Sequence, residues 1–292
     1  LIGNARRAIN KNKDIFSLNK YFLKLKRKGK IEIINNFNVE KIINTKKEII
    51  ILSKNKNFHC HKLFIACGPL STAKIILNSF KEIKYIDLKE TTLISSLWFT
   101  FRKLNYYESK LYCDYFLTKL SGNLFSSQIY ILKNKITDKI FLKQNLFKQI
   151  FRLIPNFIKN KFLIFLTYID DKNSKNVRIS KDKYKGFIIL STKNNVKTYK
   201  KIKNKINYFF QNKLLHLIDI KKNFGYGYHF GSSFPISNKK NKRGSDKLGR
   251  ILNMKNIHII DASVLPSIPV STITYTMMAN ASCIVDESVR KR

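Results

Sequence analysis

The sequence predicts a two-part fold, in which an α/β unit formed from both ends of the chain encloses an inserted α+β block built on an antiparallel sheet. Residues 63–79 read as a buried strand, a Gly-Pro turn and a helix, the order of elements found in α/β proteins. A second apolar strand and a final helix follow residue 255. Between about residues 81 and 222, longer strands alternate with amphipathic helices, a pattern typical of an α+β domain.

The N-terminal part supplies the first of these α/β elements. Residues 1–30 predict a basic helical lead-in. Strands with Ile or Val at alternating positions are expected at residues 30–43, 46–53 and 63–67. The helix after the Gly-Pro turn has Ser71 or Thr72 as its expected N-cap, and Ile75, Ile76 and Leu77 should point into the core.

The middle block contains both strand and helix patterns. Strands are expected at residues 93–103, 125–133, 176–181 and 186–192. Residues 139–162 predict an amphipathic helix broken near Pro155, and residues 195–220 predict a Lys-rich helix. The helix at 139–162 fits either a substrate-domain helix on its own sheet or an interfacial helix touching anionic lipid, and we favour the first interpretation.

Charge and cysteine content argue against several classes of function, including nucleic-acid binding and metal binding. The formal net charge of the 292 residues is +39, but lysine is scattered among Ile and Phe, as an AT-rich coding sequence would produce, and forms no basic arm. Nucleic-acid binding is therefore not the favoured role. The four cysteines form no CxxC pair, which favours a reducing, cytoplasmic compartment and no metal site. No apolar run reaches the ~20 residues of a membrane span.

The stretch "FGYGYHFGSSFPIS", at residues 224–237, is almost uncharged in a chain rich in lysine. It places His229 among aromatic residues and glycines, and Gly225, Gly227 and Gly231 would let the backbone approach a ligand closely. The C-terminal elements follow as a buried strand in "NIHIIDAS", a Pro-rich turn and a helix from Thr272 to about Val289.

These motifs together resemble a known family. "YHFGSSFPI", "DKLGRI" and "NIHIIDASVLPSIPVSTITYTMMANA" resemble the C-terminal signature of the glucose–methanol–choline (GMC) flavin oxidoreductases. "NVEKI" and "HKLFIACGPLSTAKIILNS" resemble the family's second FAD-contacting region. The family opens with a GxGxxG pyrophosphate-binding turn, and these 292 residues contain no such motif. We therefore expect the chain to correspond to the C-terminal portion of such an enzyme.

The resemblance implies three segments and a cofactor. Residues 1–80 would form part of a truncated, Rossmann-like FAD-binding domain, residues 81–222 the substrate-binding domain, and residues 223–292 the return to the FAD-binding domain. The reaction implied is oxidation of the CH–OH group of a small alcohol or sugar-like substrate, with an electron acceptor left open. The alternative is a non-catalytic basic protein that keeps the fold and binds an anionic partner, either nucleic acid or a membrane surface.

Two residues carry the implied catalysis. By resemblance, His229 would take the proton of a substrate alcohol, and an imidazole suits that task because its pKa lies near working pH. The alternative is a histidine that only caps a loop. Thr272 occupies the position where relatives carry a second His or Asn, and its hydroxyl could hold a substrate oxygen. Ser271 and Thr272 fit a helix N-cap equally well.

The FAD contacts are also implied by the resemblance. The N-terminus of the last helix would face the flavin, and Asp261 would lie beside the ribityl and pyrophosphate groups, although a strand-end turn residue is an equally good interpretation of Asp261. Val39 and Gly68 would make backbone contacts near the adenine side. The full expected set is Val39, Gly68, Asp261, Ala262, Ser271 and Ile273.

The remaining histidines are weaker candidates. His59 and His61 share one face of a predicted strand, but two histidines without a third ligand make a poor metal site. His216 lies in the predicted Lys-rich helix and is expected on the surface.

Overall fold

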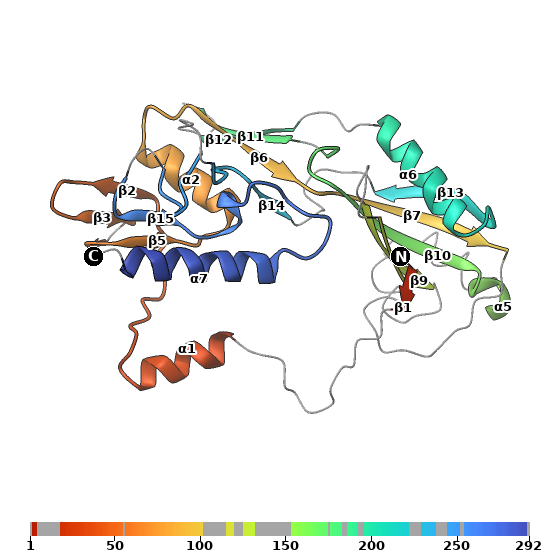
Figure 1. The fold of residues 1–292 in the computed structure, drawn as a ribbon, viewed down its shortest axis with the longest axis horizontal. Helices are drawn as coiled ribbons and strands as arrows, with labels where there is room; N and C mark the ends of the chain where they lie inside the picture. Colours follow the sequence, from red (N-terminus) through yellow and green to blue (C-terminus); the bar gives the residue numbers. More distant parts are fainter. Residues whose placement is uncertain are drawn as a thin grey trace.

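The chain folds into two packed bodies joined by continuous strands (Figure 1). The computed structural model describes residues 2–4, 18–54, 56–101, 115–119, 125–131, 153–174, 176–182, 186–191, 196–221, 229–237, 244–251 and 254–290. The first body holds the N-terminal and C-terminal α/β elements and three strands from the middle of the chain, and the second body holds the other middle strands together with the strand at residues 2–4.

The first body combines antiparallel and parallel strands around helix α2 (Pro69–Ser79). Its antiparallel three-stranded sheet is made of β2 (Lys41–Asn44), β3 (Ile49–Leu52) and β4 (Asn57–Cys60). The two parallel strands are β5 (Leu63–Ile65) and β15 (Ile257–Ile259). This parallel pair joins segments almost two hundred residues apart, so the two ends of the chain form one unit.

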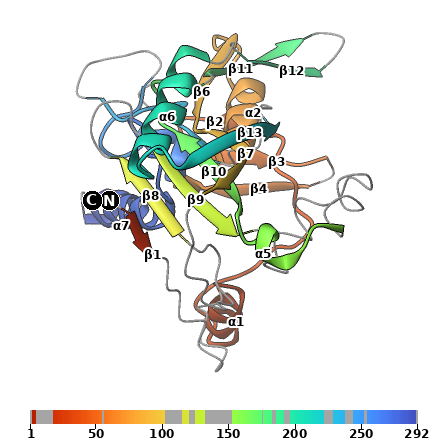
Figure 2. The same ribbon diagram turned by 90° about the vertical axis from the view of Figure 1, so that its right-hand side faces the viewer.

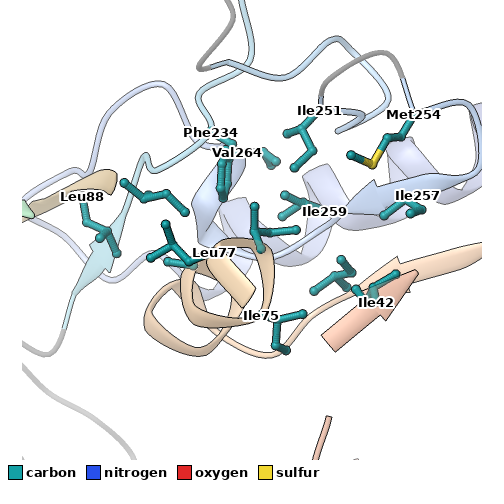
Figure 3. Packing of buried hydrophobic residues seen from close by; sticks show 14 of the residues in the cluster. Ile42, Ile75, Leu77, Leu88, Phe234, Ile251, Met254, Ile257, Ile259 and Val264 are labelled. Atoms are coloured by element: carbon teal, nitrogen blue, oxygen red, sulfur yellow. The ribbon is translucent and has the colours of Figure 1, made fainter. Parts of the chain in front are cut away.

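A four-stranded sheet completes the first body. Its order is β12 (Gly186–Ser191), β11 (Asn176–Asp182), β6 (Tyr85–Glu90) and β14 (Phe230–Gly231). Side chains from this sheet, from α2 and from the C-terminal segment share one buried core. Figure 3 shows Ile42, Leu77 and Val264 in that core, although they come from widely separated parts of the sequence. Burying such side chains is the main favourable term in folding.

The second body is a six-stranded antiparallel sheet, against which helix α6 (Val196–Phe209) packs in the described part of the chain. Its order is β1 (Ile2–Asn4), β8 (Tyr115–Lys119), β9 (Phe125–Ile131), β10 (Phe162–Ile169), β7 (Thr92–Thr100) and β13 (Leu214–Lys221). Helix α6 lies on this sheet (Figure 2). Its residues Tyr199, Ile202 and Ile206, at helical spacing, pack with Trp98 and Phe165.

Two neighbouring strands run from one body into the other. Strand β6 leads into β7 through the fully buried Thr91, and β10 leads into β11. Ile169 pairs with Thr92 and Asn176 pairs with Lys89. The connection from β10 to β11 is therefore six residues long (170–175), whereas the connection from β6 to β7 beside it spans two positions (90–91). The four additional residues make the first connection a loop at the junction of the two bodies.

The remaining elements lie at the edges. The 3₁₀ turn η1 (Ala262–Val264) leads to the last helix, α7 (Thr274–Arg290), of which only Ile284 and Ser288 are buried. Helix α5 (Asn156–Lys159) begins directly after Pro155. Helix α1 (Leu18–Arg27) stands apart from both bodies (Figures 1 and 2). Within the described residues, no helix has the length and apolar character needed to cross a membrane.

Most predicted strands are present, and Ile75, Ile76 and Leu77 are buried as predicted. The single helix predicted over residues 195–220 is wrong, because α6 ends at Phe209 and residues 214–221 form strand β13. Gln211 and Asn212 adopt left-handed φ values of 55° and 57°, which stop the helix. His216 therefore lies on a strand, with its ring edge-on to Trp98 and its Nε2 2.8 Å from Asp219 Oδ1.

Two helix starts also differ from the prediction. Helix α2 is capped by Gly68, which makes no side-chain cap, and not by Ser71 or Thr72. Helix α7 begins at Thr274, two residues later than predicted. Most of the helix predicted at 139–162, and both Gly225 and Gly227, lie outside the described residues.

The glycine at position 249 gives a test of this packing. Gly249 has a φ of 66°, and a Cβ there would collide with the carbonyl oxygen of Ile259 in β15. Gly186 has a similar φ of 74°, but its Cβ would meet no described atom within 4 Å. Gly186→Ala should cost only the left-handed strain, about 1–2 kcal/mol. Gly249→Ala should cost about 1–3 kcal/mol more, because the backbone must also move. Urea unfolding measures both losses, and equal losses would show that the β15 contact is not as close as described.

Candidate active site

His229 lies at the junction of the two bodies, directly before β14. Its carbonyl oxygen accepts a hydrogen bond of 3.2 Å from the N–H of Thr91, the buried residue between β6 and β7. Its ring stacks on the ring of Tyr168, near the end of β10, with centroids 5.6 Å apart and planes 16° apart. One residue of the first body is thus held by both strands that cross into the second.

The surroundings of His229 favour its neutral form. The residue is partly buried, and its Nδ1 is buried with no hydrogen-bond partner in the described part of the chain. Desolvation lowers the pKa of His229 below its ordinary value of 6.5. At neutral pH the imidazole is therefore uncharged and has a lone pair with which to accept a proton.

The segment after His229 is laid directly on η1. The N–H groups of Ser232, Phe234 and Ile236 donate to the carbonyls of residues 262, 263 and 264, at 2.8–3.0 Å. A Cβ at Gly231 would lie 2.5 Å from the oxygen of Ala262 and would also overlap Ile268. Glycine is required at position 231 because the two backbones approach so closely.

Asp261 is the buried link between α2 and the C-terminal segment. It is 4% exposed, and it caps η1 by accepting a 2.8 Å hydrogen bond from the N–H of Ser263. Its other oxygen accepts a 2.6 Å hydrogen bond from the hydroxyl of Thr72 in α2. Both carboxylate oxygens therefore have partners within the protein, and the residue fixes the position of η1 beneath the His229 segment.

Gly68 and Val39 lie at opposite ends of α2. Gly68 caps its N-terminus with a φ of 81°. Val39 precedes Glu40, whose carbonyl accepts a hydrogen bond from Asn78 near the C-terminal end. An 11-residue helix is roughly 16 Å long. Of these two predicted contacts, only Gly68 lies at the end of α2 that Thr72 joins to Asp261.

Ser271, Thr272 and Ile273 precede α7. Ser271 and Thr272 are exposed, whereas Ile273 packs against the small cluster of Ala262, Leu265 and Ile268. The carbonyl of Ile273 accepts the first helical hydrogen bond, 2.9 Å from the N–H of Met277. The N–H groups of the next three residues are therefore the free donors at this helix end.

The apolar cluster that contains Ala262 and Ile273 also lies close to the His229 segment. Gly231, two residues after His229, packs against Ala262 and Ile268 of that cluster.

These residues fit a flavin in part. The first turn of α7 carries no acidic residue and begins among exposed residues, so its N–H groups and dipole suit the negative end of a reduced flavin. The N-terminus of α2 at Gly68 offers a second helix end. In contrast, both carboxylate oxygens of Asp261 already accept hydrogen bonds, one from Thr72 and one from Ser263. Asp261 therefore holds the local structure in place, and it would bind a cofactor hydroxyl only if one oxygen accepted a second hydrogen bond.

The sequence did not single out the buried acidic residues of the junction. Glu90, Asp170 and Asp171 are 1–5% exposed, although the chain has only 18 acidic residues in all. The adjacent aspartates after β10, "IDD", were the available signal. His59, considered for metal binding, lies 3.0 Å from Glu48 on the surface, and no cluster of three metal-ligating side chains occurs within the described ranges.

Comparison with known proteins supports an oxidoreductase as the class of protein to which these features belong. Residues 189–281 match the family model described as GMC oxidoreductase, a range that includes His229, Asp261 and Thr272. The predicted resemblance to the C-terminal portion of a GMC oxidoreductase is thereby confirmed.

A solved structure agrees at the level of the fold. The chain is similar to pyridoxine 4-oxidase from Mesorbium loti, with a TM-score of 0.54 at 10% sequence identity. The match covers 85% of this chain and 56% of the solved one, so the chain spans little more than half the length of that protein. No curated protein matches the sequence.

His229 and His258 give a test of the electrostatics. Desolvation lowers the pKa of His258 as it does that of His229, and the Nε2 of His258 is buried without a partner in the described part of the chain. The folded state therefore binds these protons less readily than the unfolded state, whose histidines titrate near 6.5. Stability from both groups is complete above pH 6.5 and is lost as pH falls through and below that value.

The measurement is the urea midpoint between pH 7.5 and 5. We expect the loss on acidification to become smaller in His229→Gln and in His258→Gln. Asn57→Gln, at an exposed position without a titrating group, is the control and should keep the wild-type slope. An unchanged slope in both histidine variants would show that neither ring is held neutral by burial.

Proposed function

We propose that this chain is the C-terminal portion of an FAD-dependent oxidoreductase that oxidises the CH–OH group of a small alcohol or sugar-like substrate. The observation that carries the proposal is His229, a half-buried and uncharged imidazole inside the family match, at the junction of the two bodies. FAD, when bound, accepts the hydride from the substrate carbon. The remaining chemistry is a proton transfer that needs a base.

His229 is the proposed base. Its lowered pKa leaves the ring unprotonated at working pH, and stacking on Tyr168 holds its plane while its own carbonyl is tied to Thr91. The ring would take the proton from the substrate hydroxyl as the hydride leaves. Thr272, exposed before α7, is proposed to orient the substrate oxygen, because a hydroxyl is a poor base near neutral pH.

The proposed cofactor surface includes the N-terminal part of α7. Residues 256–289 contain no Lys or Arg, in a chain with 57 of them. Yet α7 exposes Tyr275 by 84% and Met278 by 47%. A chain that places lysine at exposed positions elsewhere, but not on this helix, supports a role for α7 as a covered surface. We propose that the flavin and a dinucleotide-binding segment cover it, and that the whole enzyme requires both.

Flavin binding tests the role of that segment. These 292 residues contain no GxGxxG turn, so the pyrophosphate would lack its usual helix N-terminus. The purified chain alone should bind FAD weakly or not at all, as measured by quenching of flavin fluorescence. Mixing it with the dinucleotide-binding segment of a GMC oxidoreductase should raise the affinity. Stoichiometric flavin on the chain alone would contradict the first expectation. No flavin with either form would favour the alternative basic protein with an anionic partner.

The His229 assignment is tested in the flavin-loaded enzyme. The substrate panel would contain glucose, methanol, choline and pyridoxine, for which the family and the matched structure are named. His229→Ala should leave the flavin spectrum nearly unchanged but slow flavin reduction about 10²–10⁴-fold, the usual worth of a positioned base. The rate is measured by stopped flow without an electron acceptor.

Thr272→Ala is the comparison variant and should slow the same step less. If Thr272→Ala abolishes reduction while His229→Ala reduces at the wild-type rate, the two roles are assigned to the wrong residues. Normal reduction in both variants would place the base elsewhere.

A further inference from the structure

A pair of charges from the junction reaches the loop before α7. Asp171, 5% exposed, follows β10, and its Oδ2 accepts a 3.0 Å hydrogen bond from the N–H of Ile268. The same oxygen lies 3.3 Å from the Nζ of Lys89, near the end of β6. Lys89 Nζ also donates a 3.0 Å hydrogen bond to the carbonyl of Pro266. Residues 266–268 are therefore tied to both strands that cross between the bodies.

The same loop is bonded to the His229 segment from its other side. The hydroxyl of Ser232 donates to the carbonyl of Pro266 at 3.0 Å, so that oxygen accepts from both Ser232 and Lys89. Ser232 has a left-handed φ of 55°, an uncommon conformation for a residue other than glycine. Gly231 pairs directly with Lys89 across the β14–β6 ladder. The ion pair thus lies between the segment that carries His229 and the loop that leads to Thr272.

An ion pair with a buried carboxylate and a partly exposed ammonium group contributes more to geometry than to net stability. Removing a carboxylate from water is costly, and its attraction to an ammonium group repays that cost only in part. The neighbouring Asp170 instead accepts a hydrogen bond from Asn173 within its own loop. Of the two adjacent aspartates, Asp171 is the one with a hydrogen bond to the segment before α7 among the described residues.

We propose that Asp171 and Lys89 are positioning residues, which fix the loop at residues 266–268, and through it the start of α7, relative to His229. The contacts of Asp171 and Lys89 with residues 266–268, here called the tether, are part of the described geometry. Their effect on catalysis rests on the proposed function. The experiment therefore measures the exposure of the loop first and the rate of the reaction second.

The first readout is hydrogen–deuterium exchange of peptides covering residues 262–276. Asp171→Ala removes the acceptor of the Ile268 N–H, and exchange of that amide should rise about tenfold or more, because hydrogen bonds to charged groups are the stronger ones. Asp87→Asn is the matched control. It breaks an exposed pair with Arg178 on the same sheet, at 2.6 Å, and should leave this peptide unchanged.

Lys89→Met guards against a variant that fails to fold, since the Lys89 side chain is 37% exposed. It should also accelerate exchange in residues 262–276, and the double variant should exchange more slowly than the two single effects combined predict, because the residues act on one contact. Unchanged exchange in both single variants would overturn the proposal. So would an increase spread evenly over the chain, which would indicate lost stability and not lost positioning.

The second readout is flavin reduction in the loaded enzyme. Asp171→Asn keeps an acceptor oxygen but loses the charge, and it should lower the rate at saturating substrate about tenfold with little change in KM. An unchanged rate in a variant with faster loop exchange would overturn the catalytic part of the proposal. If no substrate reduces the flavin even in the wild type, the proposed function fails, whereas the exchange result still decides the tether.

Discussion

The hydrogen bond between Thr72 and Asp261 joins parts of the chain that lie 189 residues apart. It connects α2, near the N-terminus, to η1, near the C-terminus, beside the parallel pairing of β5 with β15. Because Asp261 also caps η1, the same carboxylate sets the surface on which residues 231–236 lie. The position of His229 relative to the start of α7 depends on this buried contact, and a charged group left without it would be costly.

Lysine and arginine are unevenly distributed along the chain. The +39 charge is spread over strands, loops and helices in most of the sequence, yet residues 256–289 contain neither Lys nor Arg. That stretch includes β15, η1, the loop bonded to Lys89 and all of α7 except its last residue. This local absence of positive charge is one of the observations that support the proposed cofactor surface on α7.

The sequence predicted features that depend on neighbouring residues. The contiguous run from Ile75 to Leu77 is buried in the core of the first body, where an apolar run of this kind is removed from water. His229 was singled out because an unusual composition surrounds it and because of the family resemblance, and its catalytic role stays a prediction. The helix expected at 195–220 failed because Gln211 and Asn212 turn the chain, and apolar residues on an exposed edge such as Leu215 do not alternate cleanly. The Lys89–Asp171 pair could not be found, since a contact across 82 positions leaves no local pattern.

The paired crossing of β6 into β7 and of β10 into β11 has a mechanical consequence. The connection between β6 and β7 passes through Thr91, which bonds the backbone of His229, and Tyr168, just before the connection between β10 and β11, stacks on its ring. A shift of one body relative to the other would therefore reach the proposed base through two separate contacts, one on its backbone and one on its ring.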